Sequence, residues 1–119
     1  MPISILAVDD EQNLLELLIT VLGKRGFKVK TALNGPEALK LLDQESFELA
    51  LLDLKMGPIN GVDLLKKIKN RRPITKVIMM TAYPTNETRA EASVNGASAY
   101  LTKPVDIQKL VDTINSLAH

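Results

Sequence analysis

The stretch LALLDLKMGPING (residues 49–61) places four apolar residues directly before a carboxylate, Asp53, and follows it with a Met-Gly-Pro turn. A short apolar run bounded by turn residues is typical of a strand that is buried on both faces. Such strands belong to parallel sheets whose two faces are covered by helices. The stretch therefore predicts a central strand that ends on an acid at the edge of its sheet.

Short apolar runs alternate with amphipathic segments along the rest of the chain. The apolar runs predict strands at 3–8, 27–33, 47–53, 76–82 and 97–104. The amphipathic segments predict helices at 14–26, 35–45, 61–72, 86–96 and 106–118. Because strands that alternate with helices form a parallel sheet with right-handed crossovers, we predict an α/β fold with a doubly wound, five-stranded parallel sheet. The short connections predict one domain over residues 1–119.

Composition excludes several classes of function. The 119 residues are 45% hydrophobic and 24% charged, as in ordinary soluble domains. Cysteine is absent, which removes thiol chemistry, and the single histidine is the last residue. A net charge of +1 argues against direct nucleic-acid binding, and no apolar run reaches the roughly 20 residues of a membrane helix. We expect a cytoplasmic protein with no membrane association.

Polar side chains follow the predicted strands at their carboxyl ends, where parallel α/β sheets bind ligands. They are Asp9 and Asp10, Asp53, Thr81 and Lys103. Each has a plain alternative, since Asp10 could cap the first helix and the others could be strand-end or surface residues. Together, however, neighbouring carboxylates repel one another and favour a counter-ion. Oxygen ligands without histidine or cysteine suit Mg²⁺, with Mn²⁺ as an alternative.

A carboxylate beside such a cation can act as a nucleophile toward phosphorus. Phosphoryl transfer then requires positioning and stabilisation of charge on the equatorial oxygens. A hydroxyl from Thr81 and an ammonium from Lys103 would add to the stabilisation that the metal provides. The residues at this edge are therefore a complete set for aspartyl-phosphate chemistry.

Four motifs carry a resemblance to a known family: VDDE at the first strand, LLDLKMGPING at the third, MMTA at the fourth and AYLTKP at the fifth. Over essentially the whole chain the sequence resembles the receiver domains of two-component response regulators. The resemblance implies the flavodoxin-like fold of that family, with strand order 2-1-3-4-5. It is similar in particular to single-domain receivers of the sporulation phosphorelay, which pass phosphate to another protein.

The resemblance implies a role for each site residue. Asp53 would accept the phosphoryl group, and Thr81 and Lys103 would bind its oxygens. Thr81 and Tyr100 would form the switch that reports phosphorylation. The Lys103-Pro104 bond would be the family's cis peptide.

A second set of implied roles concerns the metal. Asp10 and Asp53 would bind Mg²⁺ by their carboxylates, Asp9 would assist through water, and Lys55 would contribute its backbone carbonyl. The family usually has Met-Pro after the acceptor strand, whereas this chain has Met-Gly-Pro at 56–58. We expect the loop that carries the Lys55 carbonyl to follow a different path.

The implied function is a signalling domain of a bacterial two-component system. It would take phosphate from a phosphohistidine on a histidine kinase or a phosphotransferase and then switch or relay the signal to a downstream protein that the sequence does not identify. It would catalyse only its own phosphorylation and dephosphorylation, and it would be a monomer that can dimerise on phosphorylation. Two alternatives stay open: a phosphate-independent binding module on the same fold and, with less support, an aspartyl-phosphate phosphohydrolase.

The first predicted helix has leucines on more than one of its sides. A single face of the sheet cannot bury all of them. We expect Leu14 and Leu18 to form part of a partner-docking stripe, although ordinary core packing would explain them equally well. The full set of predicted docking residues is Gln12, Leu14, Leu18, Tyr83, Pro104 and Ile107. The segment 86–96 has little beyond alanines and Val94 to bury, so we expect its helix to be weakly anchored.

Overall fold

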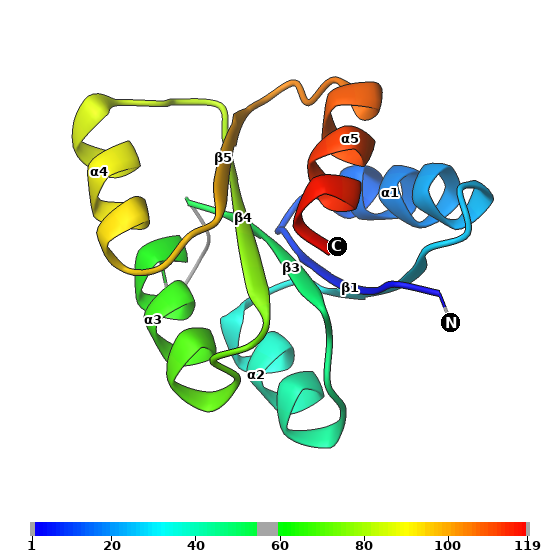
Figure 1. Ribbon diagram of the computed structural model, residues 1–119, viewed down its shortest axis with the longest axis horizontal. Helices are drawn as coiled ribbons and strands as arrows, with labels where there is room; N and C mark the ends of the chain where they lie inside the picture. The colour runs from blue at the N-terminus through cyan, green and yellow to red at the C-terminus, as the bar shows by residue number, and fades with distance from the viewer. Residues whose placement is uncertain (1, 55–59, 119) are drawn as a thin grey trace.

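Strands and helices alternate along the chain in the computed structural model, which describes residues 2–54 and 60–118. The strands in this part of the chain are β1 (Ser4–Val8), β2 (Lys28–Ala32), β3 (Leu49–Asp53), β4 (Lys76–Thr81) and β5 (Ala99–Thr102). The helices are α1 (Gln12–Lys24), α2 (Gly35–Gln44), α3 (Gly61–Arg71), α4 (Asn86–Val94) and α5 (Ile107–Ala118) (Figure 1). The predicted order of elements is confirmed.

The five strands form one parallel sheet in the order β2-β1-β3-β4-β5, which confirms the predicted fold class and strand order. In the register of the central strands, Val8 lies opposite Leu52 and Asp53 lies opposite Met80. Thr81 pairs with Thr102 on the far side. The carboxyl ends of β1, β3, β4 and β5 therefore finish at one edge, where the β4–α4 and β5–α5 connections run in Figure 1.

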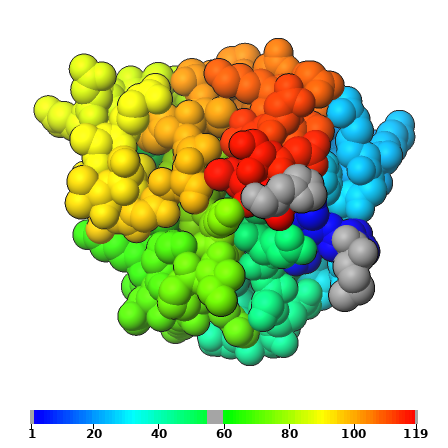
Figure 2. Space-filling model, in the orientation of Figure 1, coloured from blue at the N-terminus to red at the C-terminus, as the bar shows by residue number. Residues whose placement is uncertain are grey.

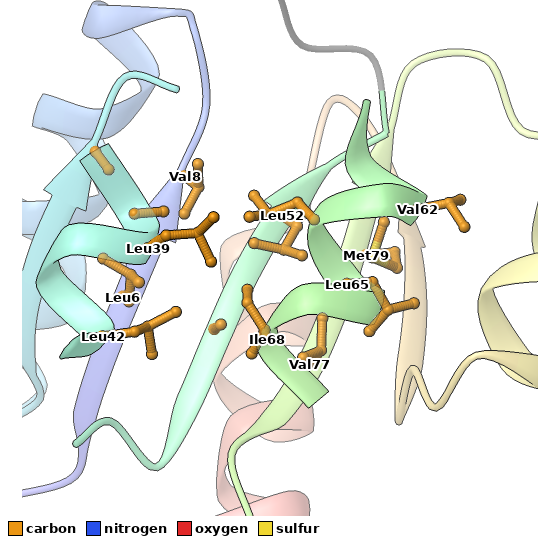
Figure 3. Close-up of a cluster of buried hydrophobic side chains, with 14 of the residues drawn as sticks. Leu6, Val8, Leu39, Leu42, Leu52, Val62, Leu65, Ile68, Val77 and Met79 are labelled. Atoms are coloured by element: carbon orange, nitrogen blue, oxygen red, sulfur yellow. The ribbon is translucent and has the colours of Figure 1, made fainter. Parts of the chain in front are cut away.

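Alternate side chains of each strand enter two separate cores, because successive residues of a strand point to opposite faces. Leu6 and Val8 of β1 pack with α2, α3 and α4, whereas Ile5 and Ala7 pack with α1 and α5. Figure 3 shows the first core, with Leu52 of β3 between α2 and α3. In Figure 2, the orange and red atoms of α5 lie beside the blue atoms of α1. The apolar run of β3 is buried throughout because both faces of the sheet are covered.

Local signals account for most helix ends. Asn34 and Asn60 cap α2 and α3 with side-chain oxygens that accept backbone N–H bonds. Asp106 caps α5 by accepting a bond from the N–H of Lys109 at 3.1 Å. Gly26, at φ +89°, follows α1 in the left-handed conformation that suits glycine at a helix end. Asp10 is not the cap of α1, because that helix begins after Glu11 without a side-chain cap.

The helix α4 is held by little apolar burial. Ala92 is its only buried residue, and Val94 is 85% exposed, although the sequence suggested that Val94 would be buried. The helix contains few large apolar side chains to pack on α3 and the sheet. In the described part of the chain, no helix combines the length and apolarity that crossing a bilayer requires.

Candidate functional site

The strand register brings the predicted carboxylates together. Since Val8 of β1 lies opposite Leu52 of β3, the next residues along the chain, Asp9 and Asp53, end up side by side. Asp9 is fully buried, Asp53 is 7% exposed, and Asp10 is exposed. Oxygen atoms of the three carboxylates lie within 4.8 Å of one another. The convergence predicted from strand ends far apart in the sequence is therefore present.

Lys103 reaches into this cluster from the end of β5. Its Nζ donates to Asp9 Oδ2 at 2.6 Å and to Asp53 Oδ2 at 3.2 Å. The Lys103-Pro104 peptide bond is cis. The backbone N–H of Lys103 also donates to the carbonyl of Thr81 at 2.7 Å, which joins the end of β5 to that of β4. One ammonium thus partly neutralises two carboxylates that would otherwise repel each other.

Two opposing effects act on the pKa of Lys103. Burial of the ammonium lowers its pKa, but the hydrogen bond and charge of Asp9, followed by those of Asp53, outweigh burial. The pKa consequently lies above its ordinary value of 10.5. Lys103 therefore remains a cation throughout the physiological range.

Thr81 and Tyr100 occupy neighbouring strands. Thr81 is 1% exposed, and its Oγ1 accepts a bond from the backbone N–H of Tyr83 at 3.1 Å. Tyr100 is half-buried, and its hydroxyl lies 2.8 Å from Thr88 Oγ1 of α4. The guanidinium of Arg89 lies 4.6 Å from the centre of the Tyr100 ring. The tyrosine therefore connects β5 with the first turns of α4.

Some predicted docking residues line a groove of about 310 Å³ between α1 and the β5–α5 connection. Leu14, Leu18, Pro104 and Ile107 line it, and so does Lys103 of the carboxylate cluster. Leu18 is only 1% exposed, because it packs in the core with α5. The exposed lining residue of α1 is its neighbour Leu17, at 48%.

The remaining predicted residues lie apart from this groove. Gln12 is exposed at the start of α1, and Tyr83 is 66% exposed after β4. Neither lines the groove. Lys55, with its predicted backbone ligand and the 56–58 turn, lies outside the described residues.

The structure adds three residues that had no role in the sequence analysis. Glu11 Oε1 lies 3.7 Å from Lys103 Nζ, and the position of Glu11 in the VDDE motif is the sequence signal that could have found it. A Cβ at Gly61 would lie 2.3 Å from the backbone oxygen of Asp53, so the N-terminus of α3 packs directly on the end of β3. Thr88 contacts Tyr100, and no spacing rule in the sequence signals that contact.

The donor set fits a hard divalent cation. Three carboxylates converge, and Mg²⁺ prefers oxygen ligands, of which protein carboxylates usually supply one or two. The carboxylate of Asp10 is exposed, so waters, several of which Mg²⁺ usually retains, can reach it. The three carboxylates at this edge therefore suit Mg²⁺.

Comparison with known proteins places these features in a family. The family described as "Response regulator receiver domain" matches residues 5–115. The chain is 39% identical over 118 residues to the transcriptional regulatory protein ZraR of Klebsiella oxytoca, covering 98% of this chain and 27% of that protein. It is 40% identical over 109 residues to the response regulator protein PilR of Pseudomonas aeruginosa, covering 92% and 24%. The chain thus spans about a quarter of the length of these curated relatives.

Solved structures agree with the sequence comparison. A CheY-like receiver domain protein from Methanospirillum hungatei superimposes with a TM-score of 0.96 at 34% identity, covering 99% of this chain and 94% of that one. A response regulator from Burkholderia pseudomallei, solved with a phosphorylated aspartic acid, a calcium ion and citrate, gives a TM-score of 0.90 at 30% identity, covering 98% and 68%. The family match, the fold and the carboxylate edge lead to one conclusion: the chain belongs to the receiver domains of response regulators.

Proposed function

We propose that this receiver domain accepts a phosphoryl group on Asp53, with Mg²⁺ as cofactor and Mn²⁺ as a substitute. Phosphoacceptor signalling is the function of its family, and the assignment of residues is our proposal. The observation that carries it is the pair of contacts from Lys103 Nζ, at 2.6 Å to Asp9 and 3.2 Å to Asp53. These contacts support a site in which the ammonium of Lys103 is held beside Asp53, which is 7% exposed, and Asp9, which is fully buried.

In the proposed reaction, a carboxylate oxygen of Asp53 attacks the phosphorus of a phosphohistidine. An O–P bond forms as the N–P bond breaks, and the electron pair returns to the imidazole, which takes a proton from solvent. Lys103 stabilises the negative charge on the transferred oxygens, and the Thr81 hydroxyl binds another of them. The carboxylates would hold Mg²⁺, which would neutralise their charge and that of the phosphoryl oxygens when bound.

We assign the metal ligands to Asp10 and Asp53, with Asp9 acting through water and Lys55 through its backbone carbonyl. The full burial of Asp9 and its short ion pair with Lys103 support an indirect role for this acid. Its Oδ1 also accepts the backbone N–H of Glu11 at 2.9 Å, so one oxygen already serves the chain itself. Asp10, by contrast, is exposed and available for direct ligation.

The donor is proposed to be a histidine kinase or a phosphotransferase that docks on the groove beside α1. Receiver domains of response regulators interact with histidine kinases, and the groove includes Lys103 in its lining. A docked imidazole would therefore be close to Asp53. Leu14, Pro104 and Ile107 would supply apolar contacts, while Gln12 and Tyr83 would lie at the periphery.

The signalling output is also a proposal. Phosphorylation would shift Thr81 and Tyr100, and the altered surface would switch or relay the signal to a protein target. We further propose one receiver domain over residues 1–119 that acts in the cytoplasm as a monomer, dimerises on phosphorylation and catalyses only its own phosphorylation and dephosphorylation. No observation favours the phosphohydrolase or the phosphate-independent module over this function.

The test is incubation with acetyl phosphate and Mg²⁺, followed by intact mass measurement. The wild type should gain one phosphoryl group, and Asp53→Asn should gain none. Asp43→Asn is the matched control, because Asp43 is an exposed acid of α2 whose ion pair is with Arg71 at 3.5 Å, and it should react as the wild type does. An adduct of equal yield in Asp53→Asn would overturn the proposal.

A further inference from the structure

The hydroxyl of Thr88 is shared between the N-terminal cap of α4 and the tyrosine of β5. It lies 2.8 Å from the Tyr100 hydroxyl and 2.9 Å from Thr85 Oγ1. It also lies 3.1 Å from the carbonyl of Thr85 and accepts the Thr85 N–H at 3.2 Å. The Thr88 N–H in turn donates to Thr85 Oγ1 at 3.0 Å, which completes a reciprocal capping box.

Four polar atoms surround this one hydroxyl, one more than it can bond at the same time. A threonine hydroxyl donates one hydrogen bond and accepts two, so three bonds are its limit. Since Thr88 has three polar atoms of Thr85 and the Tyr100 hydroxyl within bonding distance, Tyr100 takes part in the same bonding scheme as the cap. The position of Tyr100 and the first turns of α4 are therefore linked through one oxygen atom.

A second contact joins the same two elements. The guanidinium of Arg89, the next residue of α4, lies 4.6 Å from the centroid of the Tyr100 ring, within the range of a cation–π contact. The rest of the helix contributes little anchoring, because Ala92 is its only buried residue. Polar contacts with Tyr100 thus make up a large share of what holds the N-terminal part of α4 to the sheet.

We propose that Thr88 is the positioning residue that couples Tyr100 to α4: the helix is held while the tyrosine hydroxyl bonds to Thr88 and is released when the tyrosine turns away. The signalling role of this coupling rests on the proposed function, because phosphorylation of Asp53 would be the event that turns the tyrosine. The contact itself exists without phosphate, so it is tested separately from phosphoryl transfer.

The experiment measures amide hydrogen exchange of α4 in the unphosphorylated protein. Tyr100→Phe removes one hydrogen bond and keeps the ring, so exchange at residues 88–92 should rise by about fivefold, the ratio expected for one net hydrogen bond. Thr88→Val should raise exchange further, because it also breaks the capping box. Adding Tyr100→Phe to Thr88→Val should then change nothing more.

Two further variants separate coupling from general effects. Thr88→Ser keeps the hydroxyl and should retain the fivefold response to Tyr100→Phe. Thr113→Val removes a hydroxyl that bonds the carbonyl of Lys109 within α5, and it should leave exchange in α4 as in the wild type. An equal response to Tyr100→Phe with and without the Thr88 hydroxyl would overturn the coupling, and so would no response in either background.

The phosphorylated arm uses acetyl phosphate and Mg²⁺, with the mass gain measured in parallel. Exchange in α4 should rise on phosphorylation of the wild type and stay unchanged in Thr88→Val, whose exchange is already high. A further rise in Thr88→Val equal to that of the wild type would refute the coupling. A chain that gains no phosphoryl mass would refute the proposed function instead, and the unphosphorylated measurements would still decide the coupling.

Discussion

Substitution of Gly61 by alanine should damage the site through the backbone of Asp53. The added Cβ would lie 2.3 Å from the Asp53 carbonyl oxygen and 2.6 Å from the Cα of Leu54. Both neighbours are backbone atoms at and just after the end of β3, so neither can turn aside as a flexible side chain would. The contact must open by roughly 1 Å to reach an ordinary van der Waals distance. That shift would also strain the 2.9 Å bond from the Gly61 N–H to the Leu54 carbonyl.

The size of the effect follows from this displacement. Overpacking of this kind costs about 1–3 kcal/mol of unfolding free energy. A shift of about 1 Å at Asp53, the proposed nucleophile, can slow the reaction on the order of 10²-fold. Urea unfolding measures the first effect, and the rate of phosphoryl gain from acetyl phosphate at saturating Mg²⁺ measures the second.

Gly23→Ala is the matched control, because a Cβ at this position in α1 meets no atom within 4 Å. There, alanine should stabilise the helix by up to about 1 kcal/mol and leave the reaction rate unchanged. If Gly61→Ala were as stable and as reactive as Gly23→Ala, the close approach of α3 to the acceptor strand would have no consequence for the site, and the reasoning would be refuted.

Three other predictions concern the charges and the loop around the site. Lys103→Met should bind Mg²⁺ more tightly in calorimetric titration while slowing phosphoryl gain, because Asp9 and Asp53 lose their internal counter-ion; weaker binding would contradict this. In metal-free protein, the pKa of Lys103 lies above 10.5, so the stability from its ion pairs is complete below pH 10.5 and lost as pH rises through the higher folded pKa. Urea unfolding should show that the wild type loses unfolding free energy at alkaline pH and that Lys103→Met loses less. Tyr83→Ala should shorten the phosphate half-life several-fold by opening a path for an in-line water, since hydrolysis depends on alignment of that water; an unchanged half-life would exclude a shielding role for the ring.

The fold was predictable because its signals are local. The buried run of β3, the glycine after α1 and the Asp106 cap each follow from a few adjacent residues, and the elements fall within about two residues of their predicted bounds. The meeting of Asp9, Asp53 and Lys103 was predictable as well, since parallel strands end at one edge. The positions of the strand ends do not show which of the acids pairs with Lys103. The structure shows the contact of 2.6 Å between Lys103 Nζ and Asp9.

Contacts that depend on helix rotation or packing depth were not predictable. The first helix has apolar residues on several sides, so its sequence pattern does not decide that Leu18 is buried and Leu17 exposed. The hydrogen bond between Thr88 and Tyr100 joins α4 to β5, and no sequence pattern around either residue predicts it. Gly61 resembles a simple turn glycine until the backbone of Asp53 is placed against it. In each case the deciding quantity is a distance between elements, which periodicity does not encode.

The central claim is that Asp53 is the residue that carries the phosphoryl group. Its most direct test is borohydride reduction of the protein after reaction with acetyl phosphate and Mg²⁺, followed by peptide mass mapping. Because borohydride converts an aspartyl phosphate to homoserine, the account predicts homoserine at position 53 and unmodified aspartate at positions 9 and 10. Homoserine at position 9 or 10, with aspartate retained at position 53, would contradict it.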